Sequence, residues 1–374
     1  KSVAQSRGLA YVGVICANPA AAYGLSGYVG WAPGKYLVTA HEIGHNFGAN
    51  HADAPQSCTN SVMNTTLSGT TPLTFCNFSR SEIGGFVAAN GSCMLTVTNA
   101  RTAFDFDGDS RADIGVFRPS NGVWYLNRST AGFGAVQFGQ QGDRSVAADY
   151  DGDGKSDAAI FRNGAWWRIK SATGTVDVVA FGLAGDVPVP ADFDGDGKAD
   201  VAVFRPSTGV WYRLNSSNGA FLATAFGLPE DIPSAADYDG DAKADITVFR
   251  PSTGVWYRLN SSNGGFFASL FGMSGDVPVA ANFVSETRTD IAVWRPSNGV
   301  WYWLRSSDNG FGAVAFGMSG DIPTPADFDG DGRTDISVYR PSTGIWYRLN
   351  SSNGSFAAIQ FGLNGDAPVQ SYNN

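Results

Sequence analysis

The sequence has few histidines and cysteines, two residue types that often bind metals or act in catalysis, and it has no long apolar run. Its 374 residues include only three histidines and four cysteines, and none of them lies beyond residue 93. Because no stretch of about 18 or more apolar residues occurs, we expect no transmembrane helix. No Cys-x-x-Cys pair is present, which argues against a cysteine zinc cluster. Two disulfides in an oxidising compartment are favoured over four buried thiols for Cys16, Cys58, Cys76 and Cys93.

A secretory signal and an initiator methionine are also absent. The chain opens at Lys1 within a strand-like run, so we expect a fragment or processed product of something longer. The formal net charge is −9, and it is concentrated after residue 100, because residues 1–100 carry +1 and the remainder −10. An acidic C-terminal region argues against nucleic acid as a partner.

Residues 103–374 consist of a repeated unit. Its acidic start recurs at Asp105, Asp149, Asp192, Asp237, Asn282 and Asp327, at intervals of 43 to 45 residues. Each unit continues with a short apolar strand, a turn, an aromatic strand and a strand ending in Phe-Gly. In five of the six units the turn is Arg-Pro-Ser and the aromatic strand contains Trp-Tyr. Units of this length with four strands are typical of propeller blades. We predict an all-β propeller over 99–374, with six blades and seven as the alternative, closed by the C-terminal Ala-Pro-Val-Gln-Ser-Tyr-Asn-Asn segment pairing with the first blade.

Residues 1–98 have a different pattern, and they contain all three histidines. A helix is expected over about 33–47. The motif His41-Glu42-x-x-His45-x-x-Gly48-x-x-His51 begins in this helix and extends past its end. His41 and His45 are one helical turn apart, and Gly48 lets the chain turn back so that His51 supplies a third imidazole. Three imidazoles leave an open position on Zn²⁺ for a water molecule, which is typical of a catalytic site. Glu42 is then suited to act as general base toward the zinc-activated water.

Residues 8–94 resemble the C-terminal half of an adamalysin/reprolysin-type metzincin catalytic domain. The shared features are the Gly-Leu-Ala-Tyr-Val-Gly-Val-Ile-Cys run, the zinc helix, Ser-Val-Met-Asn at 61–64 and Phe-Cys-Asn-Phe-Ser-Arg-Ser-Glu-Ile. The resemblance implies a partial α+β metzincin fold, with Met63 in the Met-turn beneath the zinc. It also implies that the strand at about 9–14 pairs with extended substrate.

The same resemblance implies disulfides Cys16–Cys93 and Cys58–Cys76. One departure is Ala52 directly after the third histidine, where the family often has Asp. A second is that the N-terminal half of such a domain has no counterpart in the sequence, so we expect the chain as written to be a weak or inactive peptidase.

In five of the six units, the start of the repeat follows the pattern Asp-x-Asp-Gly-Asp-x-x-x-Asp. Alternate carboxylates on a tight loop direct their oxygens at one hard cation, so we expect about five Ca²⁺ ions. The predicted ligands are Asp105, Asp107, Asp109 and Asp113; Asp149, Asp151, Asp153 and Asp157; Asp192, Asp194, Asp196 and Asp200; Asp237, Asp239, Asp241 and Asp245; Asp327, Asp329, Asp331 and Asp335. The fifth unit has Val284 at a central ligand position, so we expect no calcium there.

These units resemble the FG-GAP/VCBS repeats of calcium-binding propellers, over about residues 103–374. A Trp-Tyr pair recurs at one strand position, where packing between blades is favoured over stacking on sugars. The pairs are Trp124-Tyr125, Trp211-Tyr212, Trp256-Tyr257, Trp301-Tyr302 and Trp346-Tyr347.

Two functions fit these features. The first is an extracellular zinc-dependent endopeptidase with one Zn²⁺, which acts on a protein or peptide substrate and uses the propeller as a calcium-stabilised targeting or binding module. The second is a calcium-dependent adhesion or carbohydrate-binding protein with an inactive peptidase remnant. The intact zinc motif favours the first. A glycan or protein ligand of the propeller fits both.

Overall fold

The computed structural model describes residues 8–9, 25–26, 102–284 and 288–369. The chain divides into two units, Lys1–Thr98 and Asn99–Asn374. In the first unit, β1 (Gly8–Leu9) pairs antiparallel with β2 (Leu25–Ser26). No helix in the described part of the chain has the length and apolar character needed to cross a bilayer.

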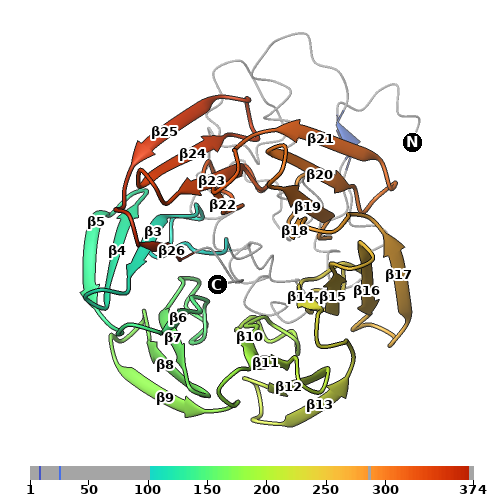
Figure 1. The fold of residues 1–374 in the computed structure, drawn as a ribbon, viewed down its shortest axis with the longest axis horizontal. Coiled ribbons are helices and arrows are strands. Elements are labelled where there is room, and N and C mark those ends of the chain that lie inside the picture. The colour runs from blue at the N-terminus through green and yellow to red at the C-terminus, as the bar shows by residue number, and fades with distance from the viewer. Residues whose placement is uncertain (1–7, 10–24, 27–101, 285–287, 370–374) are drawn as a thin grey trace, which may run out of the picture. The chain divides into compact units, whose positions relative to one another are not determined.

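The second unit is a propeller of six four-stranded antiparallel sheets (Figure 1). The strands of blades 2 and 3, in chain order, are β6 (Arg144–Ser145), β7 (Ala158–Arg162), β8 (Ala165–Ile169), β9 (Val176–Ala180), β10 (Val187–Pro188), β11 (Val201–Arg205), β12 (Val210–Leu214) and β13 (Phe221–Ala225). Those of blades 4 and 5 are β14 (Ile232–Pro233), β15 (Ile246–Arg250), β16 (Val255–Leu259), β17 (Phe266–Leu270), β18 (Val277–Pro278), β19 (Ile291–Arg295), β20 (Val300–Leu304) and β21 (Phe311–Ala315). Blade 6 contains β22 (Ile322–Pro323), β23 (Ile336–Arg340), β24 (Ile345–Leu349) and β25 (Phe356–Gln360).

Blade 1 is assembled from both ends of the propeller sequence. It contains β3 (Ile114–Arg118), β4 (Val123–Arg128) and β5 (Gly132–Gln137), and its innermost strand is β26 (Ala367–Pro368). The register places Pro368 opposite Val116. The predicted closure by the C-terminal segment is therefore confirmed, and so is the choice of six blades over seven.

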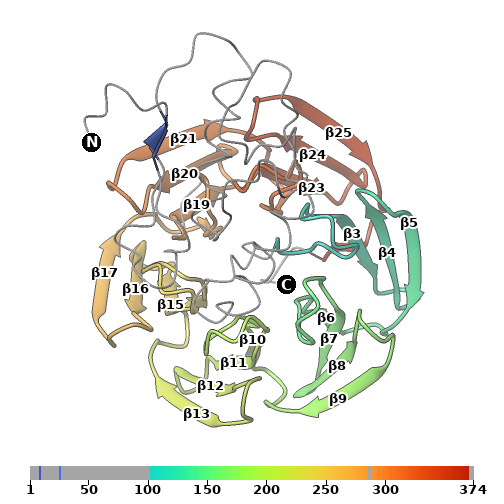
Figure 2. The same cartoon turned by 180° about the vertical axis from the view of Figure 1, so that it is seen from behind.

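Each blade has a short inner strand and a longer, more exposed outer strand. The inner strand is only two residues long and is tolerant of proline, because it is the edge strand of its sheet and has no hydrogen-bonded neighbour on one side. Seen from behind, the outermost strands β5, β9, β13, β17, β21 and β25 follow the circumference (Figure 2). In blades 2 to 6 a loop joins the innermost strand to the second strand, and in blade 1 the equivalent loop precedes β3. These loops contain the candidate site.

A tryptophan on the third strand fills the core of each blade. Trp124, Trp166, Trp211, Trp256, Trp301 and Trp346 are all at most 1% exposed. The indole of Trp256 donates to the Phe271 carbonyl across the blade at 2.8 Å, and the other five indoles make the equivalent bond. Packing thus accounts for the tryptophans of the recurring Trp-Tyr pairs, as favoured from the sequence.

Candidate metal-binding loops of the propeller

The first acidic loop wraps around the side chain of Asp105. Its carboxylate accepts backbone hydrogen bonds from Asp107 at 3.1 Å, Gly108 at 2.6 Å and Ser110 at 2.8 Å. Gly108 has a φ of +86°, which a side chain at that position would disfavour. The turn therefore brings alternate carboxylates to one side of the loop.

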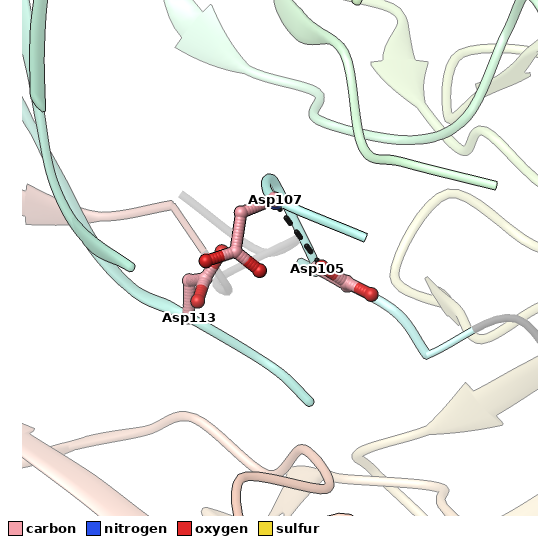
Figure 3. A group of neighbouring side chains, drawn as sticks. All are labelled: Asp105, Asp107 and Asp113. Carbon is pink, nitrogen blue, oxygen red and sulfur yellow. Dashed lines mark hydrogen bonds between the residues drawn. The ribbon is translucent and has the colours of Figure 1, made fainter. Parts of the chain in front are cut away.

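Three carboxylates of this loop meet in space (Figure 3). One oxygen from each of Asp105, Asp107 and Asp113 lies within 4.8 Å of the others. Asp113 directly precedes β3, and its carboxylate accepts from the backbone of Phe106 at 2.8 Å and of Ser129 at 2.6 Å. The hairpin amides of Thr130 and Ala131 donate to the Asp107 carboxylate at 3.0 Å and 2.7 Å.

The same arrangement recurs in four more blades. The other groups are Asp149, Asp151 and Asp157; Asp192, Asp194 and Asp200; Asp237, Asp239 and Asp245; Asp327, Asp329 and Asp335. The structure therefore brings together the first, second and fourth predicted ligands of every complete set.

The third aspartate of each set is outside these groups and is held by a serine instead. Ser129 donates to Asp109 at 2.7 Å, and Thr130 also donates to it. The equivalent pairs in the other four blades are Ser171–Asp153, Ser216–Asp196, Ser261–Asp241 and Ser351–Asp331, at 2.8 to 2.9 Å. These hairpin serines were missed from the sequence, although a serine recurs shortly after the third strand of every unit, within Asn-Ser-Ser in three of them, and is a signal that could have found them.

Without a cation, burial and the repulsion between like charges destabilise the ionised form of these carboxylates. Asp113 is 1% exposed. Burial raises the pKa of its carboxyl group to about 6, although hydrogen bonds from the backbone of Ser129 and Phe106 act to lower it. Burial likewise raises the pKa of Asp157, Asp200, Asp245 and Asp335. A positive ion between the carboxylates would offset both the cost of burial and the repulsion between the like charges.

The groups also fit a hard cation by their chemistry. Every donor is a carboxylate oxygen, the ligand type that Ca²⁺ prefers. Asp107 Oδ1 and Asp329 Oδ1 are buried and have no hydrogen-bond partner among the described residues. Such orphaned oxygens are uncommon in native proteins and indicate an unrecorded partner.

Backbone hydrogen bonds join the six loops into a closed ring. In each case an amide of one loop donates to the carbonyl of the first residue in the preceding loop. The bonds are Ser156→Asp105, Ala199→Asp149, Ala244→Asp192, Thr289→Asp237, Thr334→Asn282 and Ala112→Asp327, at 2.6 to 2.7 Å. Each loop is therefore braced by its neighbour.

The fifth loop differs, as its sequence suggested. Val284 packs against the core of its blade with Phe283 and Trp303, whose rings stack with centroids 5.3 Å apart. Among the described residues, this blade contributes no group of three metal-ligating side chains.

The predicted zinc site and the cysteines lie outside the described residues. These are His41, Glu42, His45, His51, Met63, Cys16, Cys58, Cys76 and Cys93. Their placement stays a prediction, and so does the helix over 33–47.

Two family models match the chain. Residues 4–117 match the reprolysin-like metallopeptidase family M12B, and residues 192–248 match the FG-GAP-like repeat. No curated protein matches.

Solved structures with a similar fold share little sequence with this chain. BBS1N in a complex with ARL6DN is 12% identical with a TM-score of 0.45, covering 69% of this chain and 78% of that one. Virginiamycin B lyase from Staphylococcus aureus is 10% identical with a TM-score of 0.44, at 71% and 88% coverage. An Agrocybe aegerita protein that recognises terminal N-acetylglucosamine is 19% identical with a TM-score of 0.45, at 67% and 76%. The chain thus combines a segment that matches the reprolysin-like M12B metallopeptidase family with a six-bladed β-propeller of FG-GAP-like repeats.

Proposed function

We propose that this protein is a secreted zinc-dependent endopeptidase whose propeller is a calcium-stabilised targeting or binding module. The observation that carries the proposal is the match of residues 4–117 to the reprolysin-like M12B family, together with a zinc motif that has lost none of its side chains. We place the boundary between the two domains at residues 98 and 99, where the chain also divides into two units.

In the peptidase segment, His41, His45 and His51 would hold one Zn²⁺. Three neutral imidazoles are a donor set that suits zinc and leaves a position open for catalysis. When bound, zinc would supply Lewis acidity to the scissile carbonyl. Glu42 takes a proton from the attacking water and delivers it to the leaving amine. It suits this role because it follows the first ligand, His41, in the sequence and is not itself a zinc ligand.

In the propeller, five loops would each hold one Ca²⁺. Support comes from the five groups of three carboxylates and from the orphaned oxygens of Asp107 and Asp329. The ions would neutralise buried acidic groups and so stabilise the loop ring. Calcium loops and the disulfides Cys16–Cys93 and Cys58–Cys76 suit an extracellular protein.

Metal analysis of the complete protein tests the proposal. Wild type should contain about one zinc per chain and cleave casein, and His45→Ala should lower both the zinc content and the cleavage. Asp329→Ala, which alters the propeller alone, is the matched control and should leave zinc unchanged. Zinc-free wild-type protein without peptidase activity would contradict the proposal and favour an adhesion protein with a peptidase remnant.

A further inference from the structure

A cavity of about 320 Å³ lies between blades 4 and 5. Blade 4 contributes Thr247, Arg258 and Phe267 to its walls, and blade 5 contributes Arg288, Arg305 and Asn309. Its volume is at the lower end of the range for small-molecule sites. Tyr238, which lies in the acidic loop between Asp237 and Asp245, also lines the cavity.

The charged residues that line this cavity within the described ranges are all basic. They are Arg258, Arg288 and Arg305, and no carboxylate of those ranges lines it. Within the described part of the chain, Arg258 and Arg288 form no ion pair. Arg305 pairs with Asp308 at 2.9 Å, but both side chains are about half exposed, at 44% and 55%, so solvent screens that pair.

The inner wall holds polar atoms with no protein partner. Arg258 lies between the rings of Tyr238 and Phe267, with its guanidinium carbon 5.4 Å and 4.9 Å from their centroids. Arg258 Nε and the hydroxyl of Thr247, a residue 1% exposed, are buried and unpaired among the described residues. The two residues face each other across β15 and β16. A partly buried cation without a counter-ion favours an incoming anion.

The neighbouring cavity between blades 3 and 4 is a natural comparison. It has a similar volume of about 340 Å³, but an aspartate, Asp194, lines it together with Arg213 and Lys243. Asn260 lines that cavity at the position equivalent to Arg305. The replacement of this asparagine by arginine in blade 5 therefore adds positive charge to one cavity and not to the other.

We infer that the cavity between blades 4 and 5 binds an oxyanion, a carboxylate or sulfate ester, carried by a ligand of about the size of one sugar. The planar guanidinium group of arginine can donate two parallel hydrogen bonds to the oxygens of such a group. Ile291 and Leu304 add apolar wall next to Phe267, so the body of an organic ligand is accommodated beside the charged group. Arg288 and Arg305 hold the anion, and Arg258 supplies the inner positive charge.

Calorimetry at saturating calcium tests this, with D-glucuronate, D-glucose and sodium sulfate as probes. Wild type should bind glucuronate, bind glucose much more weakly, and lose affinity for glucuronate at high salt. Arg305→Asn installs the residue found in blade 4 and should weaken glucuronate binding about tenfold.

The matched control is Lys170→Asn, which removes one positive charge at the equivalent position of blade 2. Lys170 pairs with Asp177 at 3.2 Å and is not among the residues that line the cavity between blades 4 and 5, so this variant should bind glucuronate like wild type. The two variants should melt at the same temperature. The inference fails if Arg305→Asn binds glucuronate as tightly as wild type, if glucose binds equally well, or if only free sulfate binds.

Discussion

Arg118 and Asp366 lie 248 residues apart and form a bidentate ion pair, with Nε–Oδ1 at 2.7 Å and Nη2–Oδ2 at 2.8 Å. In the other five blades the partner aspartate precedes the arginine by 19 residues. Those pairs are Asp143–Arg162, Asp186–Arg205, Asp231–Arg250, Asp276–Arg295 and Asp321–Arg340. The C-terminal copy of the aspartate therefore completes the first blade and closes the ring.

Removing the closing charge should destabilise the propeller. The Asp366 side chain is 1% exposed, so Asp366→Asn should lower the free energy of unfolding by at least about 2 kcal/mol. The matched control is Asp231→Asn, which breaks the same pair inside blade 4. Hydrogen exchange should accelerate at β26 and β3 only in Asp366→Asn. Equal exchange at these strands in both variants would show that the closing pair has no special role.

Calcium should raise the melting temperature of the propeller. A ligand that binds only the folded state adds about 2.7 kcal/mol at a concentration one hundred times its dissociation constant. We expect about five calcium ions per chain in wild type and one fewer in Asp329→Ala. An unchanged melting curve in excess EGTA would contradict the calcium assignment.

The loops show what the sequence could and could not predict. The period of the repeat predicted the blades, and the spacing of Asp105, Asp107 and Asp113 predicted their convergence, because both are local patterns. The serine that holds Asp109 comes from a hairpin 20 residues away, and Arg118 finds Asp366 only when the ring closes. Such partners depend on tertiary packing, which no local pattern specifies.

Two glycines with the same backbone conformation should respond differently to alanine. Gly254 and Gly264 have φ values of +69° and +67°. A Cβ on Gly264 meets nothing within 4 Å, but one on Gly254 comes within 2.3 Å of the Gly272 carbonyl oxygen. Gly264→Ala should cost about 1–2 kcal/mol for the left-handed conformation. Gly254→Ala should cost about 1–3 kcal/mol more for overpacking, measured by urea unfolding. Equal losses of unfolding free energy in the two variants would contradict the close approach of Gly254 to the Gly272 carbonyl oxygen.

Alkaline pH should destabilise the fold partly through Tyr339. Burial raises the pKa of this tyrosine to about 12 from 10.0, and its hydroxyl donates to the Leu363 carbonyl at 3.1 Å. The unfolded chain therefore loses its proton first, and the stabilisation is present below pH 10 and lost as pH rises toward 12. Tyr339→Phe should show a smaller loss of stability across this window. An identical pH dependence in wild type and Tyr339→Phe would argue against it.

The most direct test of the account compares Glu42→Ala with wild type in the complete protein, for zinc content and for cleavage of casein. Glu42 is assigned as the general base and not as a ligand, so Glu42→Ala should retain about one zinc per chain and lose peptidase activity by at least about 100-fold. If Glu42→Ala retains zinc and cleaves casein as fast as wild type, the proposed peptidase mechanism is wrong.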